Sequence, residues 1–168
     1  MISVIQGEYA VSQQPDAVMT TVLGSCIAAC LYDPIIKVGG MNHFLLPEAT
    51  TGPGQNVKYG AYLMELLINE MLKMGADRTR LRAKLAGGAK MNSMLNGVGD
   101  KNIAFAKRYL LSEGIPIEWE SLGGAQARRV HFYPISGRIT EKFVANDLPI
   151  EAPRAVKRQE RRQDVELF

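Results

Sequence analysis

The most restrictive feature of this chain is a pair of strongly apolar runs, "CIAACLY" at 26–32 and "VGGMNHFLL" at 38–46, which Asp33-Pro34 interrupts. Their apolar residues do not alternate strictly with polar ones. This pattern is typical of strands covered on both faces, although runs this short are also compatible with helix. We interpret the two runs and the break between them as a β-hairpin.

The rest of the chain predicts a mixed α+β domain. Apolar residues at helical spacing predict a helix from Tyr59 to Met74, which Gly75 ends. A second helix is expected from a cap at Asp100 to about Ser112. A loop rich in Gly, Pro and Thr, Glu48 to Asn56, is expected to be mobile. Further strands are expected over 17–22, 80–88, 115–122, 128–135 and 138–144.

Length and composition indicate one soluble intracellular domain. The 168 residues are 46% hydrophobic and 22% charged, and the net charge of +3 is too small to indicate nucleic-acid binding. The N-terminus has neither a basic region nor a long apolar stretch, so no secretory signal is expected. The longest apolar run is far short of the roughly 20 residues that a membrane helix needs. We expect one domain over 1–150 and a charged, frayed or solvated extension over 151–168.

Cys26 is the best candidate for a nucleophile. On one strand, Cys26 and Cys30 would have Cα atoms about 13 Å apart, too far for a disulfide, so we expect reduced thiols in the cytoplasm. Cys30 has no polar neighbour in the sequence and is expected to be a buried hydrophobe. Cys26 follows "LGS" at a turn, where backbone amides can point outward. The alternative is that Cys26 is also a small core residue.

His43 is the candidate base for that thiol. If Asp33 to Ile36 form the hairpin loop, the ladder places Cys26 directly opposite His43, close enough for a thiolate–imidazolium contact. A five-residue loop would place His43 opposite Ile27, on the other face. The sequence permits both loops, and a hydrogen-bonded core histidine is the alternative to a catalytic one.

Other chemistries fit the sequence poorly. Ser25 lacks the G-x-S-x-G pattern of a serine nucleophile. A metal held by Cys26 and His43 would need a third ligand, and no cysteine–histidine cluster supplies one. The stretches "LAGGAKM" and "NGVGDKN" match neither phosphate-binding glycine motif and are interpreted as turns. We therefore expect no metal and no cofactor.

Several segments together resemble one bacterial family. They are "TTVLGSCIA", "VGGMNHFLLP", Lys58-Tyr59, "AKLAGGA", the stretch from Gly99 to Asn102, and "LGG" followed by Arg128-Arg129. The chain resembles the CheD family of chemoreceptor glutamine deamidases from Gly7 to about Val144. It departs from the family's pattern in its charged C-terminal extension and in "GGAQAR".

The resemblance implies a fold and a reaction. The fold would be a layered α/β/β/α sandwich with mixed sheets, similar to the catalytic domain of cytotoxic necrotizing factor toxins. The reaction would be hydrolysis of glutamine side chains of methyl-accepting chemotaxis receptors to glutamate, with release of ammonia. The phosphatase CheC would be a partner. The alternatives are a non-enzymatic CheC-binding adaptor and a cysteine peptidase.

The resemblance also assigns site residues. The family's catalytic cysteine, histidine and threonine fall on Cys26, His43 and Thr20, with the adjacent Thr21 as an alternative for the threonine. Backbone amides around Ser25 and Cys26 are expected to stabilise the oxyanion. Asn42 is a candidate for a neighbouring polar or structural role on the opposite face from His43. The Glu48 to Asn56 loop is expected to form one wall of a shallow substrate groove.

Overall fold

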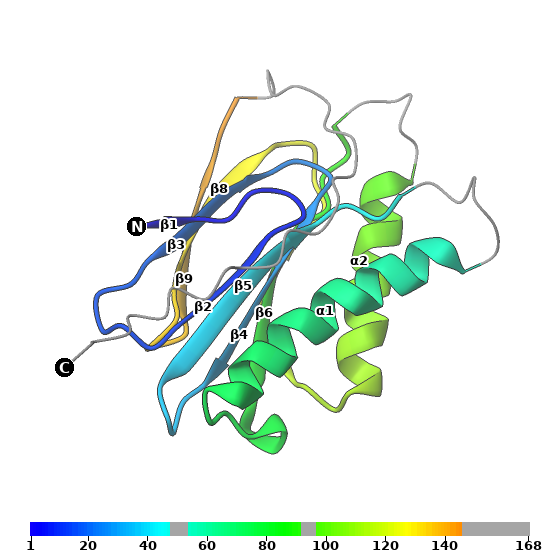
Figure 1. Cartoon of the computed structure of the whole chain (residues 1–168). Helices are drawn as coiled ribbons and strands as arrows, with labels where there is room; N and C mark the ends of the chain where they lie inside the picture. The colour runs from blue at the N-terminus through cyan, green and yellow to red at the C-terminus, as the bar shows by residue number, and fades with distance from the viewer. Residues whose placement is uncertain (48–53, 92–96, 146–168) are drawn as a thin grey trace.

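Two mixed β-sheets and two helices make up the part of the chain that the structure, a computed structural model, describes: residues 1–47, 54–91 and 97–145. Each sheet contains one parallel strand pair among antiparallel ones (Figure 1). The five-stranded sheet has the order β2 (Tyr9–Ser12), β5 (Val38–Phe44), β4 (Ile27–Asp33), β6 (Arg82–Gly87), β7 (Ile117–Leu122). The four-stranded sheet has the order β1 (Ile2–Ser3), β3 (Met19–Leu23), β8 (Arg128–Tyr133), β9 (Arg138–Phe143).

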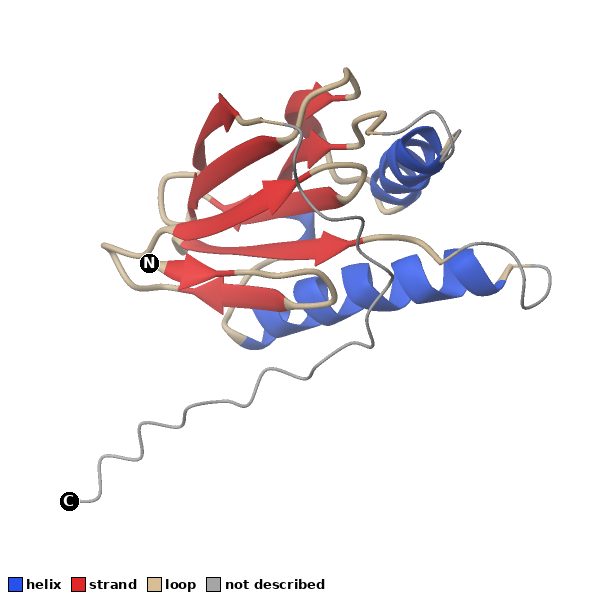
Figure 2. Ribbon diagram, turned by 90° about the horizontal axis from the view of Figure 1, so that it is seen from above, coloured by secondary structure: helices blue, strands red, loops and turns tan. Residues whose placement is uncertain are grey.

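Both helices cover one face of the five-stranded sheet (Figures 1 and 2). Helix α1 (Gln55–Lys73) packs on β2 and β5, and helix α2 (Val98–Ser112) packs on β4 and β6. Leu63 and Leu67 of α1 and Phe105 of α2 share one apolar cluster with Phe44 of β5. The other face of this sheet packs against the four-stranded sheet through a second cluster. The predicted α+β class with mixed sheets is confirmed. Three of the four expected layers are present in residues 1–47, 54–91 and 97–145. Within these ranges, no helical layer covers the four-stranded sheet.

The predicted hairpin is formed by β4 and β5, and all seven residues of each strand are buried. The predicted loop was wrong by one residue. Asp33 pairs with Val38, so the loop is 34–37 and His43 lies opposite Ala28 instead of Cys26. The Asp33 carboxylate explains the difference, because its Oδ1 accepts hydrogen bonds from the amides of Ile35 and Ile36 and so shapes the turn itself.

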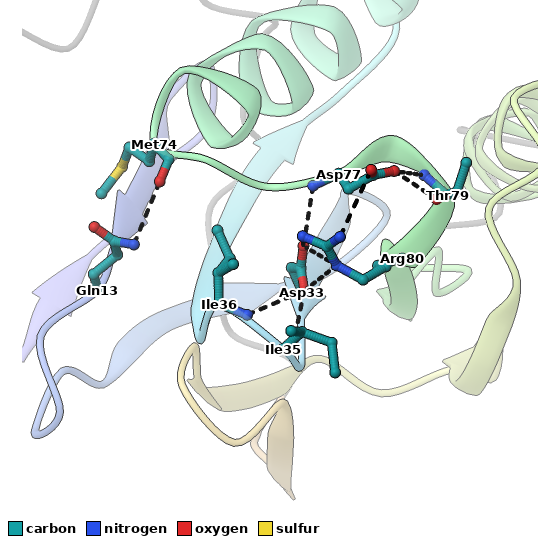
Figure 3. Close-up of polar contacts among 8 residues, drawn as sticks. All are labelled: Gln13, Asp33, Ile35, Ile36, Met74, Asp77, Thr79 and Arg80. Atoms are coloured by element: carbon teal, nitrogen blue, oxygen red, sulfur yellow. Dashed lines mark hydrogen bonds and ion pairs between the residues drawn. The ribbon is translucent and has the colours of Figure 1, made fainter.

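The same carboxylate anchors the end of the hairpin that lies farthest from Cys26 along β4. Asp33 is fully buried, and its oxygens also accept from the Arg80 guanidinium and from the Asp77 amide at 3.0 Å (Figure 3). Arg80 ends a short 3₁₀ helix, Arg78–Arg80, between α1 and β6. Burial by itself would raise the pKa of Asp33, but the hydrogen bonds from Arg80 and the backbone amides outweigh it and hold the pKa below its usual value.

Several predicted boundaries moved. Helix α1 begins at Gln55, four residues before the predicted start, after Gly54 in the left-handed conformation with no side-chain cap. Residues 48–53 of the predicted loop lie outside the described residues, as does the extension over 151–168. Strands β1 and β2 were not predicted from the sequence, and the segment between them contributes to the site below.

Candidate active site

Cys26 lies where the chain crosses from the four-stranded sheet to the five-stranded sheet, in the link between β3 and β4. Hydrogen bonds hold three successive carbonyl oxygens of this link. Gly24 O accepts from Ala89 N at 2.9 Å and Cys26 O from Gly88 N at 2.8 Å. Between them, Ser25 O accepts from the Asn102 side chain at 2.8 Å. In a trans peptide the N–H points away from the C=O, so the Cys26 amide is directed away from Asn102.

The close approach of β6 to this link requires glycine at position 87. Gly87 has φ +115°, and a Cβ at this position would lie 2.0 Å from Cys26 O. "LAGGAKM", interpreted from sequence as a turn, thus also supports the peptide that carries the thiol. Asn102 is fully buried and also accepts from Leu46 N at 3.1 Å, so α2 links the residue before Cys26 to the segment that follows β5.

His43 shares a face of the sheet with Cys26, although the two are not directly opposed. Strand residues two apart point the same way, and Ala28 pairs with His43, so Cys26 is the diagonal neighbour of the histidine. Cys26 and Ala28 both belong to the cluster between the sheets. Cys26 is 7% exposed and His43 is 4% exposed.

Two oxygens lie close to Nδ1 of the His43 ring. The Thr21 hydroxyl is 2.8 Å away and the Val4 carbonyl oxygen is 3.1 Å away. A carbonyl oxygen can only accept, so Nδ1 carries the hydrogen. In the neutral ring, Nε2 is then the basic nitrogen.

Thr21, rather than Thr20, contacts His43. Successive residues of β3 point to opposite sides, and Thr21 is the one that faces the five-stranded sheet. The Thr20 hydroxyl is buried and has no hydrogen-bond partner among the described residues. Its carbonyl oxygen accepts from Val4 N at 2.9 Å, so Thr20 supports the residue whose carbonyl holds the ring.

The segment between β1 and β2 contacts both the cysteine and the histidine, which sequence reasoning missed. The Gln6 side-chain amide lies 3.7 Å from Cys26 Sγ. Gly7 N donates to His43 O at 2.8 Å, and His43 N donates to Glu8 O at 3.1 Å. The family resemblance, which begins at Gly7, gives no indication that this segment meets Cys26 or His43.

Tyr59 and Cys30 both have raised pKa values, and Cys26 contributes to the shift of Tyr59 only. Burial and, to a lesser extent, the charge of Cys26 raise the pKa of Tyr59, so this half-buried phenol of α1 lies within electrostatic range of the sulfur. Cys30 is fully buried, and desolvation raises the pKa of its thiol strongly although Lys84 opposes the shift. Both cysteines are free thiols.

The two remaining predicted residues differ in position. Ser25 contributes its carbonyl oxygen to Asn102 and carries the peptide that leads into Cys26. Asn42 is fully buried on the helix-facing side, where it accepts from Ala29 N at 3.1 Å and contacts Met64 Sδ at 3.1 Å. Neighbouring residues of β5 point to opposite faces, so Asn42 does not line the site with His43. Its contacts favour the structural role among the two expected for it.

Within 1–47, 54–91 and 97–145, three or more His, Cys, Asp or Glu residues never gather in a group able to bind a metal ion. In the same ranges, neither helix is long and apolar enough to span a membrane.

Comparison with known proteins gives a consistent set of relatives. The family model described as "CheD chemotactic sensory transduction" matches residues 45–143, a range that begins after Cys26 and His43. A "Probable chemoreceptor glutamine deamidase CheD" of Caulobacter vibrioides is 56% identical over 94% of this chain and 83% of its own length. Proteins with the same name from Caulobacter sp. (strain K31) and Agrobacterium fabrum are 54% and 48% identical, each over 99% of this chain and over 92% and 96% of their own lengths.

Proposed function

The chain belongs to the CheD family of chemoreceptor glutamine deamidases, and we propose that it converts receptor glutamines to glutamates with Cys26 as nucleophile and His43 as acid and base. The observation that carries this assignment is the common face of Cys26 and His43, with Nδ1 of the ring held as a donor. A thiolate paired with an imidazolium is a far better nucleophile than a free thiol, which is only a few per cent ionised at neutral pH.

The reaction proceeds in two halves. In the first, the Cys26 thiolate attacks the carboxamide carbon, the C–S bond forms, and the carbonyl π electrons move to the oxygen. The imidazolium of His43 then gives its Nε2 proton to the nitrogen. The C=O bond re-forms, the C–N bond breaks, ammonia departs, and a thioester to Cys26 remains. In the second, neutral His43 takes a proton from water as that water attacks the thioester. The C–S bond breaks and releases the new side-chain carboxylic acid, which gives its proton to the freed ammonia or to solvent and becomes glutamate. The thiolate–imidazolium pair is thereby regenerated.

The surroundings of the two residues suit these steps. The Thr21 hydroxyl and the Val4 carbonyl oxygen near Nδ1 orient the ring and favour its charged form. The Cys26 amide, directed away from Asn102, is a donor for the oxyanion, and such a donor typically lowers the activation barrier by ~2.7–4 kcal/mol.

The test uses a purified receptor cytoplasmic domain as substrate. Each turnover should release one ammonia and change one glutamine to glutamate, which mass spectrometry of receptor peptides detects. Cys26→Ala should abolish both signals. Cys30→Ala is the matched control, because it removes the buried thiol and should leave the reaction intact. Activity that persists in Cys26→Ala would refute the assignment of the nucleophile.

Two finer proposals accompany this function. We place the reaction in the cytoplasm, where free thiols such as Cys26 and Cys30 stay reduced. CheC as a partner is supported by family membership alone. Co-purification with CheC, compared between the wild-type chain and Cys26→Ala, would separate binding from catalysis. The adaptor alternative predicts CheC binding with no ammonia release from the wild-type chain.

A further inference from the structure

The contact between Gln6 and Cys26 brings a primary amide to the proposed nucleophile. Gln6 is 2% exposed and Cys26 is 7% exposed, and Gln6 Nε2 donates toward Sγ across 3.7 Å. The two residues are twenty positions apart and belong to different connecting segments. Burying an amide costs free energy unless its polar atoms are hydrogen-bonded, so the bond to the sulfur helps to offset the burial of this N–H group.

The backbone around Gln6 fixes the position of the amide. Glu8 N donates to Ile5 O at 3.0 Å, which closes a four-residue turn with Gln6 and Gly7 in its centre. Gly7 has φ +83°, as a type II turn requires at its third position. Gly7 and Glu8 are in turn hydrogen-bonded to the backbone of His43. The turn is therefore attached to the base and directs its side chain to the nucleophile.

An N–H donor at this position would serve both states of the reacting centre. In the resting enzyme, a hydrogen bond to the sulfur favours the thiolate over the thiol and lowers the thiol pKa. When the C–S bond forms, the negative charge moves from sulfur to the carboxamide oxygen. That oxygen is attached to the carbon bonded to Sγ, so a donor that reaches the sulfur lies near the developing oxyanion.

We propose that Gln6 is a further catalytic residue, whose side-chain N–H stabilises the Cys26 thiolate and then the oxyanion formed on the substrate carboxamide. This proposal rests on the proposed deamidation, and it adds a side-chain donor to the Cys26 backbone amide. The proton stays on Gln6 throughout, since the amide only donates a hydrogen bond.

Two variants remove the donor in different ways. Gln6→Met retains the length of the side chain and lacks any N–H, while Gln6→Asn retains the amide and withdraws it by one methylene. Gln13→Met is the matched control. The Gln13 side-chain amide donates to Met74 O at 3.4 Å. Figure 3 draws this contact together with the hydrogen bonds of Asp33, the residue at the end of the hairpin farthest from Cys26. Thermal unfolding of each variant identifies any that fail to fold.

Two readouts separate a catalytic role from a structural one. The first is the pH dependence of Cys26 alkylation by iodoacetamide, with the adduct located by peptide mass spectrometry. The second is kcat and KM for ammonia release from a receptor cytoplasmic domain. Both Gln6 variants should shift the alkylation midpoint to higher pH and lower kcat by about 10²-fold with little change in KM. Gln13→Met should change neither.

The outcomes decide between the two proposals. If a folded Gln6 variant matches Gln13→Met in either the alkylation midpoint or kcat, the role of Gln6 is refuted and the deamidation stands. If the wild-type chain releases no ammonia, the proposed function fails and the catalytic role of Gln6 fails with it. The alkylation profile then still reports whether Gln6 stabilises the thiolate.

Discussion

Replacing Thr21 by valine, compared with the same replacement at Thr20, tests which threonine orients the catalytic histidine. Thr21→Val retains the shape of the side chain and removes the hydroxyl that lies 2.8 Å from His43 Nδ1. The Val4 carbonyl oxygen, 3.1 Å from the same nitrogen, still holds the ring. The variant therefore loses one hydrogen bond to a group that is charged during the reaction, a contribution of about 1.5–3 kcal/mol.

That loss corresponds to a decrease in kcat of about 10- to 100-fold, since roughly 1.4 kcal/mol is tenfold in rate. Thr20→Val removes a buried hydroxyl that has no hydrogen-bond partner within the described ranges, so its kcat should stay within about twofold of wild type and its stability should be equal or higher. Ammonia release from a receptor cytoplasmic domain measures both rates. Equal losses in the two variants, or a larger loss in Thr20→Val, would refute the role of the Thr21 hydroxyl.

Three further substitutions test how the fold supports the site. Asp33→Asn should lower the free energy of unfolding in urea by about 3 kcal/mol, the lower end for a broken buried ion pair because Arg80 is partly exposed. Since the pKa of Asp33 is lowered on folding, its stabilisation should be complete at neutral pH and lost as pH falls below about 4, a dependence that Asp33→Asn should flatten. Gly87→Ala should cost at least ~1–2 kcal/mol from its φ of +115°, and the clash with Cys26 O should reduce ammonia release further. Gly97→Ala is its control, because it has φ +83° with nothing within 4 Å of the added Cβ, so it should lose stability without losing kcat. Asn102→Leu leaves Ser25 O without its donor and Leu46 N without its acceptor. Each loss should lower the free energy of unfolding by about 1–3 kcal/mol, and amide hydrogen exchange over residues 24–27 should become faster.

The relation between Cys26 and His43 shows what strand periodicity can predict. The predicted register was displaced, yet the prediction that both side chains share a face was correct. The displacement moved the partner of His43 from Cys26 to Ala28, two positions along β4, and residues two apart point the same way. The turn position depended on the Asp33 side chain, whose bonds to Ile35 and Ile36 the apolar pattern does not encode.

The contacts that orient the two reacting groups were harder to predict. Strand β1 has only two residues and β2 only four, too short for a periodic signal. The distinction between Thr20 and Thr21 depends on which face of β3 meets the five-stranded sheet, and this is set by packing between the sheets. Gln6 lies in a turn, where composition indicates a change of direction and gives no information about the partner of the side chain.

The site therefore combines two levels of organisation. A local hairpin brings a thiol and an imidazole to one face with little loop entropy, since only seventeen positions separate them. Orientation comes from distant segments: the Val4 carbonyl and Thr21 hydroxyl at the ring, Gln6 at the sulfur, and Asn102 at the peptide before it. Because orientation contributes much of the rate in reactions between fixed groups, weakening these segments should lower kcat before it unfolds the chain. Variants of the Val4–Glu8 segment are the most direct test, since this segment contacts both reacting residues. The strands that flank it, β1 with two residues and β2 with four, are short, so a change there should disturb the site more than the rest of the fold.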